Sequence, residues 1–235
     1  MNTPTIRIVT GTRLTFQNFV ENSLLGKSLT SYKPNNVEVK IYTENSLGLS
    51  EIYNKEIEQA KLEPVILVFI HDDVMLLDHY WSYHLIEGLE KFDIVGIAGS
   101  KRRTPYQPSW LHVGSKGETL QWDDEEFLSG LVAHDENWPP KIMSYYGKPN
   151  QQVIQLDGVF LAANSETLIK NDIRFDPQFK FHFYDLDFSR TCDNKGLKLG
   201  TVPIAICHGG KGKMNTIDFK NMYNLYHKKW EINTL

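Results

Sequence analysis

The stretch Pro64-Val65-Ile66-Leu67-Val68-Phe69-Ile70-His71-Asp72-Asp73-Val74 decides the fold of this 235-residue chain. Its apolar run is typical of a strand that is buried on both faces, as in a parallel sheet. Because an unpaired carboxylate is costly to bury, Asp72 and Asp73 should lie where the strand emerges. Ligands bind at the carboxyl ends of strands in open α/β sheets, and paired carboxylates suit a hard divalent cation. The stretch therefore predicts a metal-dependent enzyme that acts on an anionic substrate.

Strands alternate with helices on both sides of this stretch. The residue pattern predicts strands over 6–9, 37–42, 65–70 and 94–98, and helices over 16–25, 50–61 and 81–91, with Ser50 as a helix cap. Such alternation is typical of βαβ units with right-handed crossovers. We therefore expect an α/β fold, in which one domain has a mostly parallel central sheet flanked by helices.

The regular pattern is lost between residues 99 and 149, where prolines and tryptophans are scattered among polar residues. A long irregular stretch in a compact domain is usually functional, and the aromatic content argues against disorder. We expect short hairpins that line a cleft. Trp110, Trp122 and Trp138 lie in this stretch, where their flat apolar rings either line the cleft or belong to the core.

Regular elements return after residue 150. We expect a strand over 153–163 that Asp157-Gly158 interrupts, a helix over 165–170, a helix over 184–194 that Gly196 ends, and a strand over 197–207. Thr216 should cap a last helix. Its apolar stripe comprises Phe219, Met222, Tyr223, Tyr226 and Trp230. This stripe should pack on the sheet or on a second copy, in a homodimer through the C-terminal helix.

The composition is that of an ordinary soluble domain, with 41% apolar and 23% charged residues. A net charge of −4 gives no reason to expect nucleic acid as a partner. No apolar run is long enough to form a transmembrane segment, and no secretory pattern opens the chain. Two cysteines are too few for a disulfide scaffold, so we expect a cytoplasmic protein with reduced thiols.

Four places carry residues suited to catalysis or metal binding. Asp72-Asp73 is either a cation seat or a solvated turn after a strand. Residues 182–187 open a helix with two aspartates, which either act chemically or meet the helix dipole. His208 ends an apolar strand, as Asp73 does, so both could face one cleft. Asp157-Gly158 marks either a bulge or a close approach by a ligand.

Basic residues follow two of the predicted strands. Lys101, Arg102 and Arg103 follow the fourth strand, and Lys211 and Lys213 lie in a glycine-rich loop after His208. They either grip phosphate groups or form a solvated cluster. Neither GxGxxG nor GxxxxGK[ST] occurs, so the fingerprints of a dinucleotide fold and a P-loop are missing.

Taken together and in this order, these residues resemble a family-two-type glycosyltransferase with a GT-A fold, and within it the small bacterial subgroup related to the streptomycin-biosynthesis protein StrF. The resemblance covers about residues 5–210. It rests on residues 50–54 (SEIYN), 70–73 (IHDD, like the DXD region), 156–160 (LDGVF), 183–187 (FYDLD, like the ED motif) and His208. It implies one domain, with a Rossmann-like nucleotide-sugar-binding half over about 1–98, an acceptor half over about 99–215 and a C-terminal helix over 216–235.

The resemblance also implies an activity and a set of site residues. The activity is metal-assisted, inverting transfer of a sugar from a nucleoside-diphosphate sugar to the hydroxyl of a saccharide or other acceptor, as in polysaccharide biosynthesis. Asp185 would be the general base, and Asp73 with His208 would hold Mn²⁺ or Mg²⁺, with Asp72 as a secondary candidate. The donor side would comprise Thr10, Gly11, Arg13, Glu44, Asn45, Asn54, His71, Asp72, Arg102, Lys211 and Lys213. The acceptor side would comprise Asp157, Gly158, His182 and Tyr184.

Two departures from the family pattern keep other functions open. His71 replaces the first carboxylate of the DXD motif, and Tyr184 stands where the ED motif commonly has Glu. A nucleotide-sugar-binding module without catalysis is therefore one alternative. A sugar nucleotidyltransferase is another, although the turn at residues 10–13 is short and has one basic residue.

Overall fold

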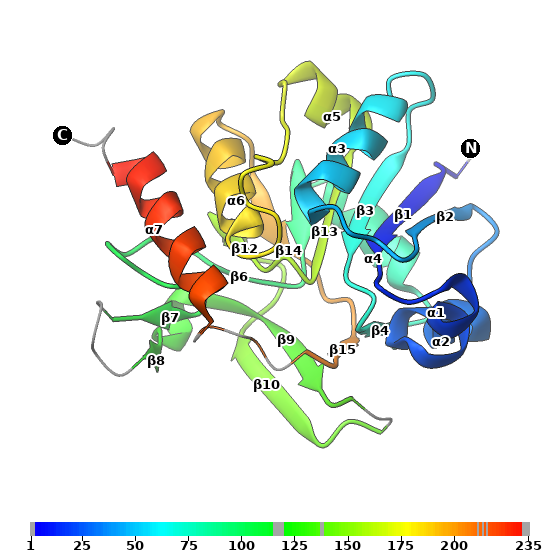
Figure 1. Ribbon diagram of the computed structural model, residues 1–235, viewed down its shortest axis with the longest axis horizontal. Helices are drawn as coiled ribbons and strands as arrows, with labels where there is room; N and C mark the ends of the chain where they lie inside the picture. Colours follow the sequence, from blue (N-terminus) through cyan, green and yellow to red (C-terminus); the bar gives the residue numbers. More distant parts are fainter. Residues whose placement is uncertain are drawn as a thin grey trace.

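The computed structural model describes residues 3–114, 120–136, 139–210, 212, 214 and 216–231. A seven-stranded sheet, in the order β11-β14-β5-β13-β3-β1-β2, runs through the molecule (Figure 1). Its strands are β1 (Ile6–Gly11), β2 (Val37–Tyr42), β3 (Ile66–Ile70), β5 (Ile94–Gly96), β11 (Gln152–Val153), β13 (Phe160–Asn164) and β14 (Leu199–Thr201). Every residue of β3 is buried, since β3 lies between β1 and β13. The strand predicted to be buried on both faces is confirmed.

Five of the seven strands run in the same direction, as expected for a mostly parallel sheet, although the pairing is mixed. The β1–β2, β1–β3 and β5–β14 pairs are parallel, whereas β13 runs antiparallel to both β3 and β5, and β11 antiparallel to β14. The chain leaves this sheet after β5, builds a second sheet beyond it, and returns to form β13 without a helical crossover. A parallel neighbour would have needed such a crossover.

The second sheet has the order β12-β6-β9-β15-β4, with β10 paired to β9. Its strands are β4 (Val74–Leu76), β6 (Ala98–Ser100), β9 (Leu128–His134), β10 (Ile142–Gly147), β12 (Gln155–Leu156) and β15 (Ile206–His208). A short pair, β7 (His112–Val113) with β8 (Gln121–Trp122), and the 3-10 helix Glu125–Phe127 lie nearby in sequence. The irregular stretch therefore does form hairpins, as expected.

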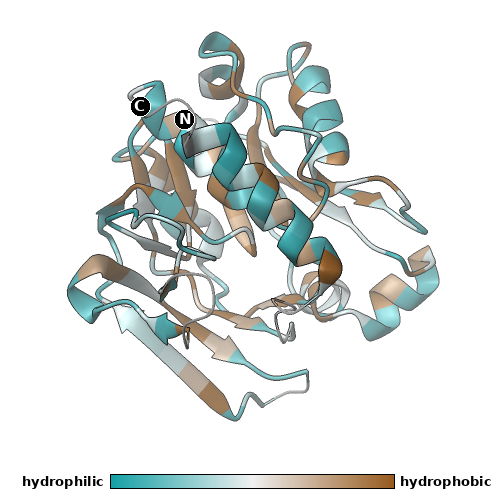
Figure 2. Cartoon of the chain, turned by 60° about the vertical axis from the view of Figure 1, so that its left-hand side comes forward, coloured by the Kyte–Doolittle hydropathy of each residue, from teal (hydrophilic) through white to brown (hydrophobic). Residues whose placement is uncertain are grey.

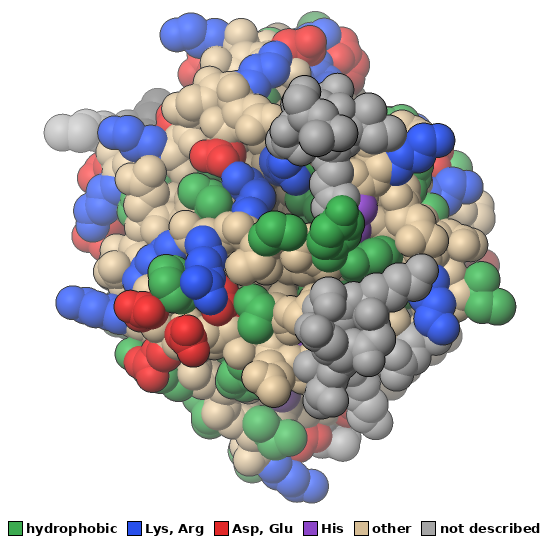
Figure 3. Space-filling view, turned by 90° about the vertical axis from the view of Figure 1, so that its left-hand side faces the viewer, with side chains coloured by type: hydrophobic (Ala, Val, Ile, Leu, Met, Phe, Trp, Pro, Cys, Tyr) green, Lys and Arg blue, Asp and Glu red, His purple; other side chains and the backbone are tan. Residues whose placement is uncertain are grey.

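Seven α-helices are found in the described residues, and Figure 2 shows that hydrophilic residues are frequent along them, whereas apolar residues concentrate in the strands. They are α1 (Phe16–Asn22), α2 (Leu24–Ser31), α3 (Leu49–Gln59), α4 (Trp81–Leu89), α5 (Ser165–Lys170), α6 (Tyr184–Asn194) and α7 (Ile217–Glu231). On the face drawn in Figure 3, acidic and basic side chains are interspersed.

Several predicted elements are divided or shifted by local contacts. The helix expected over 16–25 is two helices, because Ser23 is extended and its hydroxyl accepts the Gly26 N–H at the start of α2. The strands expected over 94–98 and 197–207 each split between the two sheets. Gly48, rather than Ser50, caps α3, since the Ser50 hydroxyl donates to the carbonyl of Phe179.

The last helix packs against its own chain. The ring of Tyr226 lies 5.4 Å from that of Phe183 and 6.2 Å from that of Phe179, and the indole Nε1 of Trp230 donates to Asp187 on α6. Thr216 caps the helix by accepting the Phe219 N–H, as expected. Because the stripe is used within the chain, the homodimer through this helix stays a prediction without support from this face.

Two further expectations concern the chain as a whole. Cys192 and Cys207 are free and buried. In the part of the chain that the structure describes, no helix combines the length and apolarity needed to cross a membrane.

Candidate active site

Three side chains gather where β3 and β15 end. His71 and Asp73 follow β3, and His208 is the last residue of β15. Asp73 Oδ1 lies 3.9 Å from His71 Nδ1 and 3.5 Å from His208 Nε2, and one ligand atom of each residue lies within 4.8 Å of the others. We call these three residues the metal group, because two imidazoles and a carboxylate at this spacing could hold a divalent ion.

Backbone hydrogen bonds hold the turn that carries the metal group. The His71 N–H donates to the Val159 carbonyl (3.2 Å) and the Gly209 N–H donates to the Asp73 carbonyl (2.8 Å). The β15–β4 pairing sets His208 opposite Val74, next to Asp73 in the chain. The predicted meeting of Asp73 and His208 therefore follows from an antiparallel strand pair.

His71 is held by two aromatic residues of the segment before and at the start of α6. Its Nε2 lies 2.8 Å from the hydroxyl of Tyr184, and the Phe181 ring stacks on the imidazole with centroids 5.8 Å apart. Tyr184 is 2% exposed, whereas Phe181 is half exposed. The first position of the DXD-like motif is thus tied to the ED-like motif.

Gly158 is hydrogen-bonded to two residues of the ED-like motif. Tyr184 donates its hydroxyl to the Gly158 carbonyl (2.7 Å), and the Gly158 N–H donates to Asp185 Oδ2 (3.0 Å). A Cβ at position 158 would lie 2.3 Å from Tyr184 Oη and 3.0 Å from Asp185 Cβ. Only glycine therefore fits, which explains the residue that interrupts the predicted strand.

The charges of the metal group influence one another. Burial acts to raise the pKa of Asp73, but the imidazoles of His208 and His71 outweigh it and hold the pKa below its usual value. Burial acts to lower the pKa of His208, and Asp73 outweighs it in turn and raises the pKa. Burial lowers the pKa of His71. The side chains thus favour an ionised carboxylate beside a neutral His71.

Asp185 has a different electrostatic setting. Burial, followed by the negative charge of Asp157, raises the pKa of Asp185 to about 7. Asp157 itself accepts the Val159 N–H (3.1 Å) and so shapes the turn. A carboxylate with a pKa near 7 is suited to accept a proton at neutral pH.

The predicted donor side lies around the ends of β1 and β2. Burial raises the pKa of Asp72, and the neighbouring Thr12 acts in the opposite direction. The Asn45 N–H donates to the Thr12 carbonyl (2.8 Å), so the two loops are joined. Thr10 is fully buried, and its hydroxyl has no hydrogen-bond partner among the described residues.

Gly11, Arg13 and Glu44 were predicted for the same donor side and lie at or just after the ends of β1 and β2. A Cβ on Gly11 would meet Ile52 Cδ1 at 2.6 Å, so α3 packs closely against the end of β1. Arg13 and Glu44 are exposed, and Glu44 adopts a left-handed backbone with φ of 49°.

Other predicted site residues are committed to structural contacts. Both amide atoms of Asn54 bond to the backbone of Phe175 (2.7 and 2.9 Å). The Arg102 guanidinium pairs with Asp123 and lies 3.6 Å over the Phe127 ring. The His182 ring packs against Phe219 with centroids 5.3 Å apart. Lys211, Lys213 and Trp138 lie outside the described residues.

Two residues near the metal group have no signal in the sequence. The His134 ring lies 6.1 Å from the His208 ring, and His134 Nε2 lies 3.2 Å from the Tyr146 hydroxyl. The pairing of β9 with β15 sets His134 opposite His208. Only the register between these distant strands could have revealed this neighbour.

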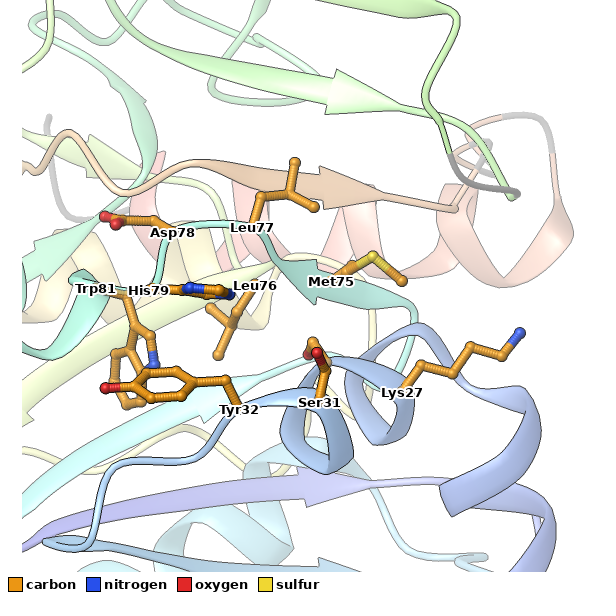
Figure 4. A pocket seen from close by; sticks show the side chains of 10 residues that line it. Lys27, Ser31, Tyr32, Met75, Leu76, Leu77, Asp78, His79 and Trp81 are labelled. Carbon is orange, nitrogen blue, oxygen red and sulfur yellow. The ribbon is translucent and has the colours of Figure 1, made fainter.

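A separate hollow lies between α2 and the segment from β4 to α4 (Figure 4). Its volume is about 330 Å³, and the rings of Tyr32 and His79 meet across it with centroids 4.9 Å apart. None of the predicted site residues lines it, so it is distinct from the metal group.

Residues 24–230 match the model of a family described as "Glycosyltransferase like family". The chain belongs to this family. The match spans most of the sequence and confirms the expected enzyme class, a glycosyltransferase. The StrF-related subgroup stays a prediction. No curated protein matches the sequence.

Solved structures show the same fold in other glycosyltransferases. GalNAc-T7 with UDP, GalNAc and Mn²⁺ is 12% identical with a TM-score of 0.58, over 98% of this chain and 50% of that chain. The mannosyltransferase PcManGT from Pyrobaculum calidifontis, in complex with GDP-Man and Mn²⁺, is 12% identical with a TM-score of 0.53, over 99% of this chain and 65% of that chain. The expected GT-A-type fold is confirmed, and this glycosyltransferase spans half to two thirds of those chains.

Proposed function

We propose that this protein is a metal-assisted, inverting glycosyltransferase that moves a sugar from a nucleoside-diphosphate sugar to an acceptor hydroxyl. The observation that carries the proposal is the link between the metal group and Asp185, because Tyr184 bonds to His71 and both Tyr184 and Asp185 bond to Gly158. Gly158 thus connects a cation site to a general base, and a single displacement at an anomeric carbon needs both.

The metal group fits a divalent ion by its chemistry and its spacing. Asp73 Oδ1 is buried and makes no hydrogen bond among the described residues, although it faces both imidazoles. Ligand atoms 3.5 to 3.9 Å apart are compatible with one ion at about 2.0–2.2 Å from each. The two similar structures contain Mn²⁺ with UDP or GDP-Man, which supports Mn²⁺ and a nucleotide-sugar donor here. When bound, the ion would offset negative charge on the departing nucleoside diphosphate.

Asp185 is proposed to accept the proton of the attacking hydroxyl. The Gly158 N–H orients its carboxylate, and the pKa of about 7 keeps a large fraction in the basic form at neutral pH. One displacement by an external hydroxyl inverts the anomeric centre. On the acceptor side we propose Asp157, Gly158 and Tyr184, with His182 nearby.

The donor is proposed to bind over the ends of β1 and β2. The joined loops there bring Asp72, Gly11 and Asn45 to the carboxyl ends of the strands, and Thr10 is buried beneath them. Arg13 and Glu44 are exposed at the same loops. A cytoplasmic location and a role in polysaccharide biosynthesis stay predictions.

Thermal unfolding with a panel of nucleoside diphosphates, each with and without Mn²⁺, tests the proposal. We expect one nucleotide with Mn²⁺ to stabilise the protein by about 2.7 kcal/mol at a concentration of 100 times Kd. If no nucleotide stabilises the protein in either condition, the donor site is wrong. Binding without release of nucleoside diphosphate from any sugar donor would favour a binding module. Release of pyrophosphate would favour a nucleotidyltransferase.

A further inference from the structure

We propose that Tyr184 is a positioning residue for the metal group, which fixes the tautomer of His71 so that its Nδ1 presents a lone pair to the cation. The inference rests on the cation site of the proposed function and adds the role of this hydroxyl. It makes the two departures from the family pattern, His71 and Tyr184, a matched pair rather than two separate losses.

One hydrogen atom decides the tautomer of His71. The Tyr184 hydroxyl lies 2.7 Å from the Gly158 carbonyl and 2.8 Å from His71 Nε2. The carbonyl can only accept, so the single hydroxyl hydrogen goes to Gly158. His71 Nε2 must then donate to Tyr184 Oη. In a neutral imidazole this leaves Nδ1 without a hydrogen, as a lone-pair donor to a metal.

The free nitrogen is the one that faces the metal group. His71 Nδ1 lies 3.9 Å from Asp73 Oδ1, and the ring is fixed by the stacked Phe181 on one side. Histidine ligands commonly donate their second ring N–H to a neighbouring acceptor, which fixes the tautomer and makes the ligand more basic. Here that acceptor is a phenol oxygen, anchored in turn by the main chain.

The anchor has little freedom to move. Tyr184 is 2% exposed, and its ring packs on Tyr53 and Phe175 with centroids 6.0 Å away in both cases. Gly158 leaves just enough room for the hydroxyl, since a Cβ there would lie 2.3 Å from Tyr184 Oη. The position of the phenol oxygen is thus set by packing, and removing the hydroxyl alone takes away the acceptor that fixes the tautomer of His71.

Mn²⁺ binding to the nucleotide-free protein tests the inference without an activity assay. We expect Tyr184→Phe to weaken Mn²⁺ binding about 10- to 100-fold, as other losses of such outer partners do. The control Tyr42→Phe removes a tyrosine hydroxyl that donates to Glu56 (2.8 Å) and not to His71, and it should bind Mn²⁺ within twofold of the unsubstituted protein. Titration is followed by the electron spin resonance signal of free Mn²⁺, and circular dichroism verifies that each variant is folded.

A double-mutant cycle with His71→Ala separates positioning from a general loosening of the fold. If Tyr184 acts through His71, Tyr184→Phe has no further effect on Mn²⁺ binding once His71 is removed. The absorption spectrum of bound Co²⁺ should change in Tyr184→Phe and stay unchanged in Tyr42→Phe.

Three results would overturn the inference in distinguishable ways. Equal Mn²⁺ affinity of Tyr184→Phe and the unsubstituted protein removes the role of Tyr184. An equal loss with and without His71 shows that Tyr184 acts by another route. If the unsubstituted protein binds no Mn²⁺, alone or with a nucleoside diphosphate, the cation site of the proposed function fails as well.

Discussion

Asp185 and Asp187 lie two residues apart on α6, yet the helix turns them into opposite surroundings. Asp185 accepts backbone N–H groups from Gly158 and Leu186, and burial together with Asp157 raises its pKa to about 7. Asp187 is 1% exposed and lies 2.7 Å from Lys229 Nζ and 2.8 Å from Trp230 Nε1 on α7. Two residues correspond to about 200° around a helix, so the side chains point to different neighbours.

The partners of each carboxylate distinguish the structural aspartate, Asp187, from the proposed catalytic one, Asp185. Asp187 is buried with a cation and an indole donor, which together attach α7 to the body of the protein. Among the described residues Asp185 has no cation beside it, and burial, followed by the charge of Asp157, raises its pKa so that its proton exchanges near neutral pH. Their shared position at the start of α6, and thus the favourable helix dipole, does not separate the two roles.

The largest effect should come from removing the proposed base. Asp185→Asn keeps the size of the side chain but cannot accept the proton, so the transfer rate should fall about 10²- to 10⁴-fold. Nucleotide binding should be unchanged, as measured by thermal shift. Transfer at the unsubstituted rate would rule out Asp185 as the base.

Gly158→Ala should displace Asp185 and leave the contacts of Asp187 with α7 intact. The added Cβ would lie 2.3 Å from Tyr184 Oη and 3.0 Å from Asp185 Cβ, so both side chains must shift. We expect at least a tenfold loss of transfer and a stability loss of about 1–3 kcal/mol from overpacking. Urea unfolding gives the second quantity. As a control, Gly196→Ala, at the end of α6, meets no atom within 4 Å and has a strained φ of +77°, so it should lower stability without changing the transfer rate of the remaining folded protein.

Asp187→Ala should have the reverse profile. It leaves the Lys229 ammonium and the Trp230 N–H without their shared acceptor, so the free energy of unfolding should fall by about 2–4 kcal/mol. The rate of transfer by the folded fraction should change less than threefold. A rate loss as large as that of Asp185→Asn would show that Asp187 is also needed for transfer.

The pH dependence of transfer and of stability should report the protonation of Asp185. The basic form is lost as pH falls through the raised pKa, so activity should fall about tenfold per unit below about pH 7. A bound cation would move this limb to lower pH. The sign for stability is opposite: a raised carboxyl pKa means that stability declines as pH rises from about 4 to 7, and Asp185→Asn should make that decline shallower, since the raised pKa of Asp72 also contributes to it. Both curves are measured from pH 5 to 9, and an acid limb retained in Asp185→Asn would assign it to another group.

The smallest effect should come from Lys229→Met. Lys229 also bonds to Asp176 (2.8 Å) and its side chain is 31% exposed, so part of the lost interaction is with solvent-screened charge. We expect a stability loss of about 1–2 kcal/mol and an unchanged rate of transfer. The loss should be smaller in an Asp187→Asn background, because the same ion pair is removed by either change. Additive losses would mean that Lys229 does not stabilise α7 through Asp187.

Much of the fold could be predicted from local pattern. The apolar run before Asp72-Asp73 predicted a strand, which the structure forms as β3. The predicted bounds of β2 and α6 also agree with the structure. The end of α6 at Gly196 and the cap of α7 at Thr216 also agree. These features depend on neighbours within a few residues, where periodicity and backbone preference dominate.

The sequence by itself therefore determined the order and kind of most elements, and it marked Asp73, Asp185 and His208 as candidates. Only the tertiary structure joined His71 to the metal group, used Asn54 and Arg102 as structural ties, and set β13 antiparallel. The reason is physical: a helix or strand forms from contacts a few residues apart, whereas the His71–Tyr184 bond spans 113 residues. Which distant side chains meet depends on strand register and on the close packing that Gly158 allows, and neither is encoded in any short stretch of the chain.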